Sequence, residues 1–196
     1  MGTQITCPCP AEFGNPDTFD IEPGVTLTMK NVSIRAGATA GSALDVQGTL
    51  DLESSSLSEN QGSFVILDEP TGSLTLRNTT LNHNSGIAVD AQGAAALFND
   101  TISGNAFGVF PDGGSVALTN TIVANNTTHD CSSHVTSAVT SIDTDGTCGV
   151  PLTAAPRLAT LDNNGGSTLT QALLPGSPAI DAGPSAPRSP SWPCSA

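Results

Sequence analysis

Two sets of side chains in this sequence have types and spacings that suit ligand binding. The first set is acidic: Asp45, Glu69 and Asp90 each stand three residues before a glycine that recurs along the chain. Carboxylates stacked on one another repel unless a cation bridges them, and Ca²⁺ prefers such oxygen ligands. We therefore expect either a calcium site or a solvated acidic edge at these three residues.

The second set consists of small side chains one and three residues after the same recurring position. Its hydroxyl members are Thr26, Thr28, Thr49, Ser73, Thr75 and Ser115, and alanines and Asp51 fill the remaining places. This pattern predicts a flat, nearly uncharged surface that suits a flat partner such as ice, a polysaccharide or a neighbouring protein. The outward strand of any repeat protein of low charge has the same appearance, so both interpretations stay open.

Residues for catalysis are not evident. A polysaccharide lyase needs acidic calcium ligands beside an arginine or lysine, and a glycoside hydrolase needs two carboxylates at a set separation. The arginines stand at unlike positions of the repeat, and the chain has no tyrosine and one tryptophan, Trp192, for stacking on sugars. We predict no catalytic residue.

An internal repeat positions these side chains. Three segments that begin at Gly72, Gly93 and Gly114 share one pattern, with a step of 21 residues from each to the next. Apolar residues alternate after each glycine, an asparagine follows, and one more apolar residue comes after it. A short repeat of strands and corners without a helical period predicts an all-β fold, the stacked coils of a parallel β-helix.

Two earlier segments, which begin at Val25 and Gly48, extend the array to at least five coils. We predict an N-terminal cap over residues 1–24, β-helix coils over 25–126, and a disulfide-closed excursion, last coil and C-terminal cap or tail over 127–196. In the cap, Cys7 and Cys9 are too close for an easy mutual disulfide, so Cys194 is a candidate partner for one of them.

Residues at equal positions of the repeat should form columns, because neighbouring strands are stacked at about 4.8 Å. One column contains Lys30, Glu53 and Arg77, and its alternating signs predict exposed ion pairs of small energetic value. The asparagine that ends each alternation predicts a ladder of hydrogen-bonded amides at a corner. This second column contains Asn31, Asn78, Asn99 and Asn120.

Charge and composition limit the partners of the chain. Only 12 % of the residues are charged, yet the net charge is −13 and lysine and arginine together number five. Phosphate binding requires clustered basic residues, so nucleic acid and anionic membrane surfaces are disfavoured as partners. No apolar run is long enough to span a membrane.

The cysteines and sequons indicate an extracellular or cell-surface location. The chain has five cysteines, and five Asn-x-Ser/Thr sequons begin at Asn31, Asn78, Asn99, Asn125 and Asn126. The sequons coincide with repeat corners, which explains them without glycosylation. The chain opens without a charged and apolar leader, so we recognise no signal peptide in it.

Cys131 and Cys148 most simply form a disulfide that closes a surface excursion. A bridge over this separation stabilises by roughly 3 kcal/mol on the chain-entropy model. His129 and His134 lie nearby in the sequence. Zinc bound by these two histidines and two cysteines is the alternative, although the spacing fits no common zinc site.

The C-terminal part resembles a known family. The motif Asn-Gly-Gly-x-Thr at 164–168, followed by Ser-Pro-Ala-Ile-Asp-x-Gly at 177–183, is similar to the end of the bacterial choice-of-anchor Q domain proteins. The coils also resemble polymorphic outer membrane protein repeats, and the resemblance covers about residues 72–183. It implies a right-handed, pectin-lyase-like β-helix of about five to seven coils, secretion, and attachment to a cell surface or matrix. It implies no reaction.

We therefore predict a non-catalytic secreted or cell-surface β-helix protein that acts in adhesion, matrix structure or assembly and needs no cofactor unless it binds calcium. The alternative is an ice- or glycan-binding module that uses the Thr/Ser/Ala surface, and a polysaccharide lyase or hydrolase comes third. The expected partners are other surface proteins, a glycan, ice, or further copies stacked on the ends of the β-helix. We also expect Leu169, Leu173, Leu174 and Ile180 to pack on the last coil.

Overall fold

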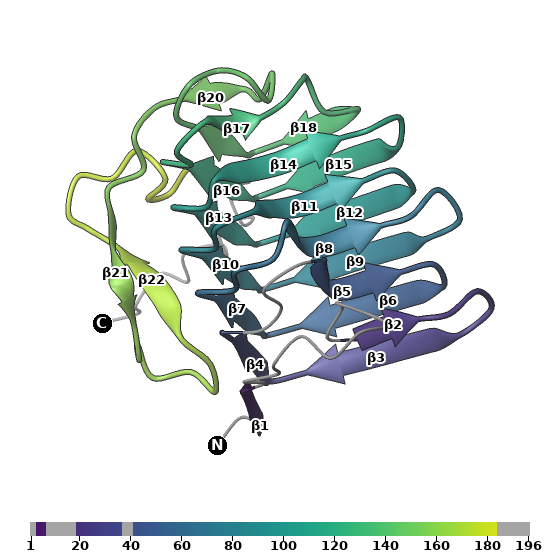
Figure 1. Cartoon of the computed structure of the whole chain (residues 1–196). Coiled ribbons are helices and arrows are strands. Elements are labelled where there is room, and N and C mark those ends of the chain that lie inside the picture. The colour runs from purple at the N-terminus through teal and green to yellow at the C-terminus, as the bar shows by residue number, and fades with distance from the viewer. Residues whose placement is uncertain (1–2, 7–18, 37–40, 184–196) are drawn as a thin grey trace, which may run out of the picture.

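The computed structural model describes residues 3–6, 19–36 and 41–183, and in them the chain winds into a stack of coils with three walls (Figure 1). Each wall is a parallel β-sheet. Sheet A consists of β1 (Thr3–Thr6), β4 (Val32–Arg35), β7 (Ser56–Ser58), β10 (Thr80–Asn82), β13 (Thr101–Ser103), β16 (Ile122–Ala124), β19 (Ile142–Asp143) and β20 (Leu152–Thr153). Sheet B consists of β2 (Phe19–Ile21), β5 (Ser42–Val46), β8 (Phe64–Asp68), β11 (Ile87–Ala91), β14 (Phe107–Pro111) and β17 (His129–Cys131). Sheet C consists of β3 (Thr26–Lys30), β6 (Thr49–Glu53), β9 (Ser73–Arg77), β12 (Ala94–Phe98), β15 (Ser115–Thr119) and β18 (Ser137–Val139).

The chain passes through sheets B, C and A in turn, so three consecutive strands make one coil. The described residues contain six such coils, from β2–β3–β4 to β17–β18–β19. This arrangement confirms the predicted all-β parallel β-helix and its number of coils. The first coil begins at β2 rather than at Val25. Cys7, Cys9 and Cys194 lie outside the described residues.

The core is built from columns of aliphatic side chains, because each strand pairs with the next coil without a shift in register. In sheet C, for example, Leu52 pairs with Leu76, Leu76 with Leu97 and Leu97 with Leu118. All four are completely or almost completely buried. Full burial of each leucine contributes about 2 kcal/mol, which no single coil could gain alone.

The asparagines at the corner between sheets C and A have a backbone role. Asn31, Asn78, Asn99 and Asn120 all adopt φ between 50° and 58°, the left-handed conformation that asparagine tolerates better than most residues. Of the amide ladder predicted for them, the described residues show one bond, from Asn120 Nδ2 to Asn99 Oδ1 at 2.8 Å. The predicted ladder is therefore confirmed only for the pair Asn99 and Asn120 among the described residues, because the corner requires the left-handed turn and not the amide bond.

A continuous amide ladder exists instead at the corner between sheets A and B. It runs through Asn60, Asn84, Asn105 and Asn126, each Nδ2 donating to the Oδ1 of the next at 2.7–3.0 Å. The same oxygens accept the backbone N–H groups of Asn60, Asn84 and Asn105. The ladder ends on Asp130, whose Oδ1 accepts the backbone and side-chain N–H groups of Asn126. The buried amides are thus paired along the column, which removes the cost of burying them.

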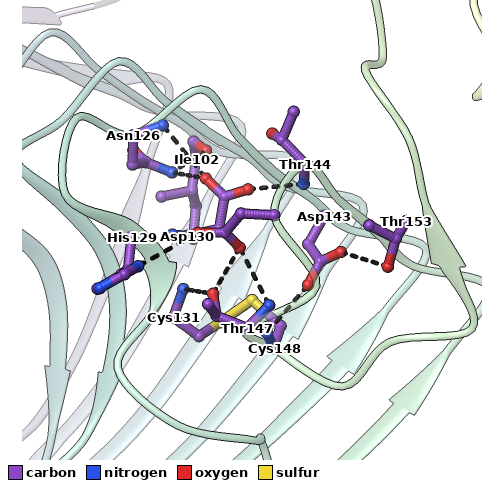
Figure 2. The surroundings of a disulfide bond; sticks show 11 residues. Ile102, Asn126, His129, Asp130, Cys131, Asp143, Thr144, Thr147, Cys148 and Thr153 are labelled. Carbon is purple, nitrogen blue, oxygen red and sulfur yellow. Dashed lines mark hydrogen bonds and ion pairs between the residues drawn. A yellow bond between two sulfur atoms is a disulfide. The ribbon is translucent and has the colours of Figure 1, made fainter.

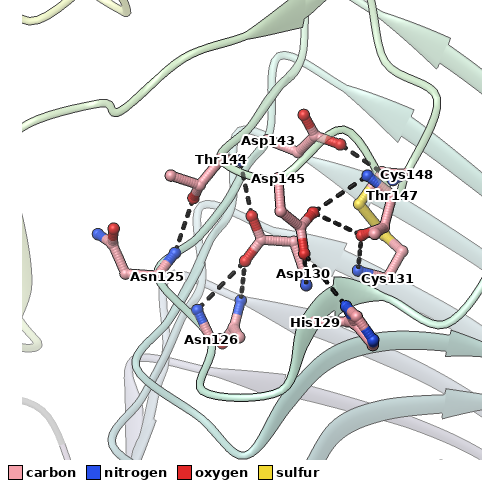
Figure 3. A network of polar contacts seen from close by, with 10 residues as sticks. All are labelled: Asn125, Asn126, His129, Asp130, Cys131, Asp143, Thr144, Asp145, Thr147 and Cys148. Carbon is pink, nitrogen blue, oxygen red and sulfur yellow. Dashed lines mark hydrogen bonds and ion pairs between the residues drawn. A yellow bond between two sulfur atoms is a disulfide. The ribbon is translucent and has the colours of Figure 1, made fainter.

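A disulfide closes the last coil at the C-terminal end of the stack, because β18 and β19 lie between its two cysteines rather than in a surface excursion. Cys131 and Cys148 form the predicted disulfide, so the zinc alternative is wrong. Figure 2 shows Asp143 beside the disulfide, where its carboxylate accepts the N–H of Cys148 at 2.9 Å and the hydroxyl of Thr153 at 3.0 Å. Figure 3 shows the neighbouring network, in which Asp145 accepts the backbone N–H and the hydroxyl of Thr147. Together these bonds hold the turn after β19 against the last coil.

The C-terminal hairpin, formed by antiparallel β21 (Leu158–Asp162) and β22 (Thr170–Leu173), does not extend the stack. It folds back along the outer face of sheet A, as Figure 1 shows. Ser167 reaches Asn31 of the first coil at 2.7 Å, and Thr168 donates to the carbonyl of Ser54 at 3.1 Å. Gln171 contacts the side chains of Asn82 and Ser103.

The course of the hairpin corrects the expectation that Leu169, Leu173, Leu174 and Ile180 pack on the last coil. Leu173, Leu174 and Ile180 are 37–45 % exposed, and Leu169 lies beside sheet A rather than on the last coil. Over the first four coils the hairpin is held mainly by hydrogen bonds to a face of serine and asparagine, which offers little apolar surface to its apolar residues.

We predict that Asn105→Ala lowers the free energy of unfolding by roughly 3 kcal/mol, because the buried amides on both sides lose partners. The measurement is urea denaturation. Asn99→Gly is the matched control, since glycine keeps the left-handed corner, and it should change the free energy by less than about 1 kcal/mol. Equal losses in the two variants would contradict the assignment of the ladder to the A–B corner.

The double variant Cys131→Ser, Cys148→Ser should lose roughly 3 kcal/mol of stability. Because the disulfide closes one end only, amide hydrogen exchange should accelerate most in β17–β19 and least in β8–β13. The wild-type protein under reducing conditions should behave as the double variant does. A uniform acceleration across all coils would show that the disulfide does not act on the last coil alone.

Candidate ligand-binding face

The outer face of sheet C gathers all six of the predicted ligand-binding residues. One column contains Thr26, Thr49, Ser73, Ala94 and Ser115, and the next contains Thr28, Asp51, Thr75, Ala96 and Ala117. Thr26, Thr28, Thr49 and Ser115 are exposed, and Ser73 and Thr75 are half-buried. We call these two columns the sheet C face.

Strand geometry fixes the spacing of the sheet C face. Members of one column are about 4.8 Å apart, and the two columns are about 6.6 Å apart because two residues of a parallel strand span that length. The small side chains alternate with leucines that point into the core, such as Leu50 and Leu74. The backbone therefore holds the hydroxyl and methyl groups in a fixed array, and their rotamers cost little entropy on binding.

The third outward column of sheet C carries the charges. Lys30 and Glu53 form the predicted ion pair at 2.7 Å. Arg77 stands next to Glu53 in register but pairs with Asp51 at 3.7 Å and lies over the ring of Phe98 at 4.8 Å. These exposed pairs are worth less than about 1 kcal/mol each and border the sheet C face without closing it.

The three parallel sheets are joined coil by coil around a stacked core, and the register does not change from coil to coil. This architecture is that of a β-helix. A model described as the right-handed β-helix region matches residues 18–164. The chain belongs to the right-handed β-helix family. No curated protein and no solved structure matched it. In the part of this β-helix that the structure describes, no helix is long and apolar enough to cross a membrane.

The predicted acidic column does not form as one line. In sheet B the register places Leu67 between Asp45 and Asp90, and Glu69 lies two residues further on, past the end of β8. Within the ranges 19–36 and 41–183, no three His, Cys, Asp or Glu side chains are close enough together to hold a metal ion. Calcium binding by these residues stays a prediction.

Asp68 is a functional group that the sequence pattern did not single out. It is completely buried at a core position, because its column continues into Val46 and Ala91. A Cβ at Gly72 or Gly93 would collide with the Asp68 carboxylate and nearby carbonyl oxygens, so the recurring glycine makes room for the buried acid. Burial, and then the charges of Asp90 and Glu69, raise the pKa of Asp68 to about 7.

A second buried acid interrupts a ladder of hydroxyl groups at the corner between sheets C and A. The side chains of Ser55, Asp100, Thr121 and Ser141 each accept a backbone N–H from the preceding coil. Thr79 and Thr121 also donate their hydroxyl hydrogen to carbonyls, those of Leu52 and Leu97. Asp100 Oδ2 has no hydrogen-bond partner in the part of the chain that the structure describes. A carboxylate lacks the hydrogen that a hydroxyl would donate there.

Burial raises the pKa of Asp100 to about 8, against the opposing effect of the backbone N–H groups of Thr79 and Phe98 and of the Arg77 charge. The protonated acid resembles the threonine of the neighbouring coils, since it has a hydrogen to donate. The sequence signal was available: Asp100 stands in the repeat where Thr79 and Thr121 stand.

We predict that the β-helix loses stability as pH rises. Asp68 and Asp100 keep their protons in the folded state up to pH values near 7 and 8, whereas an unfolded aspartate releases its proton near 4. The folded state is therefore favoured at low pH, and this contribution is lost as pH rises from about 4 to about 8. Urea midpoints at pH 5 and pH 8.5 test this.

Asp100→Thr should raise the urea midpoint at pH 8.5 and flatten its dependence on pH, because threonine is the residue of the neighbouring coils. Glu22→Gln removes an exposed carboxylate and serves as the matched control. If the urea midpoint of Asp100→Thr depended on pH as steeply as that of the wild type, the Asp100 carboxyl would not be the source of the pH dependence.

Proposed function

We propose that this protein is a non-catalytic, secreted or cell-surface β-helix that adheres to an extended polysaccharide or matrix partner through the sheet C face. The single observation that carries this proposal is the register of sheet C, which presents small outward side chains from five successive strands in two straight columns. A repeating polymer offers contacts at regular intervals, so a regular array can bind it at many weak points at once.

The charge supports an adhesive role toward a neutral partner. The net charge of −13 repels anionic polymers, and the sheet C face itself carries the one acid Asp51, which is paired with Arg77. The disulfide supports an oxidising compartment outside the cytoplasm.

Two of the three arginines that the structure describes support the absence of a catalytic role. A lyase or hydrolase of this fold needs a basic or acidic group free to act on the substrate. Arg35 is paired with Glu59 at 2.6 Å and Arg77 with Asp51, so both are engaged with neighbouring carboxylates.

The experiment is retention of the purified protein on insoluble cellulose, chitin, xylan and ice, with and without Ca²⁺. Thr28→Tyr on the edge strand β3 and Thr75→Tyr on the central strand β9 place rings on the sheet C face. Each should lower retention on the binding polymer at least tenfold, because a flat partner can no longer approach. Thr160→Tyr, at an exposed threonine of β21, is the matched control and should bind as the wild type does.

Circular dichroism should show the same fold in all three variants. Retention that is unchanged by Thr28→Tyr and Thr75→Tyr, or absent on every polymer, would contradict adhesion through this face. Release of sugar ends from any polymer would contradict the non-catalytic assignment.

A further inference from the structure

A groove separates the outer face of sheet A from the C-terminal hairpin, and the proposed adhesion does not use it. Its volume is about 590 Å³, which is in the range of small-ligand sites. Ile122, Ile142 and Leu152 of sheet A line one side, and Leu173 and Ala179 line the side of the hairpin. The groove therefore has aliphatic walls.

The walls differ from the rest of the same sheet. The outward column of sheet A reads Ser33, Ser56, Thr80 and Thr101, then Ile122, Ile142 and Leu152. Hydroxyl residues lie where the hairpin bonds to the sheet, and aliphatic residues lie where the groove opens. Val139 and Leu173, which are 56 % and 37 % exposed, also line the groove. Aliphatic groups gathered around one hollow favour a ligand with an apolar part.

Polar groups lie at one end of the groove. Asn99 and Asn120 line it, and their mutual hydrogen bond uses one N–H of Asn120 and the carbonyl of Asn99. An amide has two N–H donors and a carbonyl acceptor, so the N–H groups of Asn99 and the carbonyl of Asn120 can bond to a ligand. Thr140 also lines the groove, and its buried Oγ1 has no hydrogen-bond partner in the described residues. These groups suit hydroxyl or acetamido substituents.

The charge of the lining selects a neutral ligand. Among the residues that the structure describes, Asp100 is the one ionisable residue that lines the groove, and it is buried. An anionic sugar would find no basic partner there and would be repelled by a protein of net charge −13.

We propose that this groove binds a neutral sugar that carries a methyl group, as 6-deoxyhexoses and N-acetylhexosamines do. The methyl group and the C–H face of the ring pack against Ile122, Ile142 and Leu152. The hydroxyl or acetamido groups bond to Asn99 and Asn120. This inference is independent of the sheet C face and stands if that face has no ligand.

The test is a titration of the full chain, followed by NMR of its isoleucine, leucine and valine methyl groups. Methyl fucoside and N-acetylglucosamine should shift the signals of Ile122, Ile142 and Leu152. Glucose, which lacks the methyl group, should bind about fourfold more weakly, and glucuronate should give no shift. Equal binding of all four sugars, or shifts with none of them, would overturn the proposal.

Asn120→Gly removes the amide and keeps the left-handed backbone, and it should weaken binding of the methyl sugars about fivefold. Asn78→Gly makes the same change at the equivalent corner outside the groove and should have no effect. If both variants weaken binding equally, the effect comes from the corners and not from the groove. Ala182→Phe, which places a ring in the groove from the tail, should abolish binding without lowering the melting temperature.

Two further outcomes identify other occupants. If deletion of residues 184–196, and no sugar, shifts the groove methyl signals, the chain itself fills the groove and the proposal is wrong. If Thr28→Tyr and Thr75→Tyr abolish binding of the methyl sugars, these bind on the sheet C face. That result would support the proposed adhesion through the sheet C face and overturn the proposal that the groove binds a sugar.

Discussion

Hydrogen bonding between coils at one fixed register is the constraint on which this molecule depends. Each strand pairs with the same positions of the coil above and below, so every side chain is stacked on its counterpart about 4.8 Å away. A residue type therefore fits a column only if its side chain can pack against the same residue type, or against one of complementary charge, in the next coil. Leucine does so by apolar contact, asparagine by amide bonding, and lysine by pairing with glutamate, as Lys30 and Glu53 do.

Acids tolerate this stacking least, and their placement reflects it. In sheet B, Asp20 and Asp45 pair directly, whereas Leu67 separates Asp45 from Asp90. Two of the buried acids, Asp68 and Asp100, have uncharged column neighbours: Val46 and Ala91 beside one, Thr79 and Thr121 beside the other. Both have a raised pKa, because burial disfavours the charged form. A chain with 18 acidic residues and five basic ones thus limits the repulsion between its coils by separating some of its carboxylates and by raising the pKa of Asp68 and Asp100.

The coils and the columns of the sheet C face could be predicted from the sequence because periodicity encodes them, and the disulfide because Cys131 and Cys148 are near each other in the chain. A 21-residue period could not distinguish the two asparagine columns, since Asn78 and Asn84 recur with the same step and only the curvature of the coil decides which amide is buried. The predicted column of Asp45, Glu69 and Asp90 does not form, because the turn between sheets B and C differs in length from coil to coil. The groove and the course of the hairpin were beyond reach, since contacts such as that of Ser167 with Asn31 join segments 136 residues apart and follow no period.

The C-terminal hairpin changes the way in which the stack can come apart. In a solenoid each coil touches only its neighbours, so unfolding can start at an end and advance one coil at a time. Here one segment touches the first coil through Asn31, the second through Ser54, and later coils through Asn82 and Ser103. Loss of a terminal coil then also breaks bonds of the hairpin, which links distant coils in one cooperative unit. Under mechanical tension, the hairpin makes the array resist as a whole where separate coils would unfold one by one.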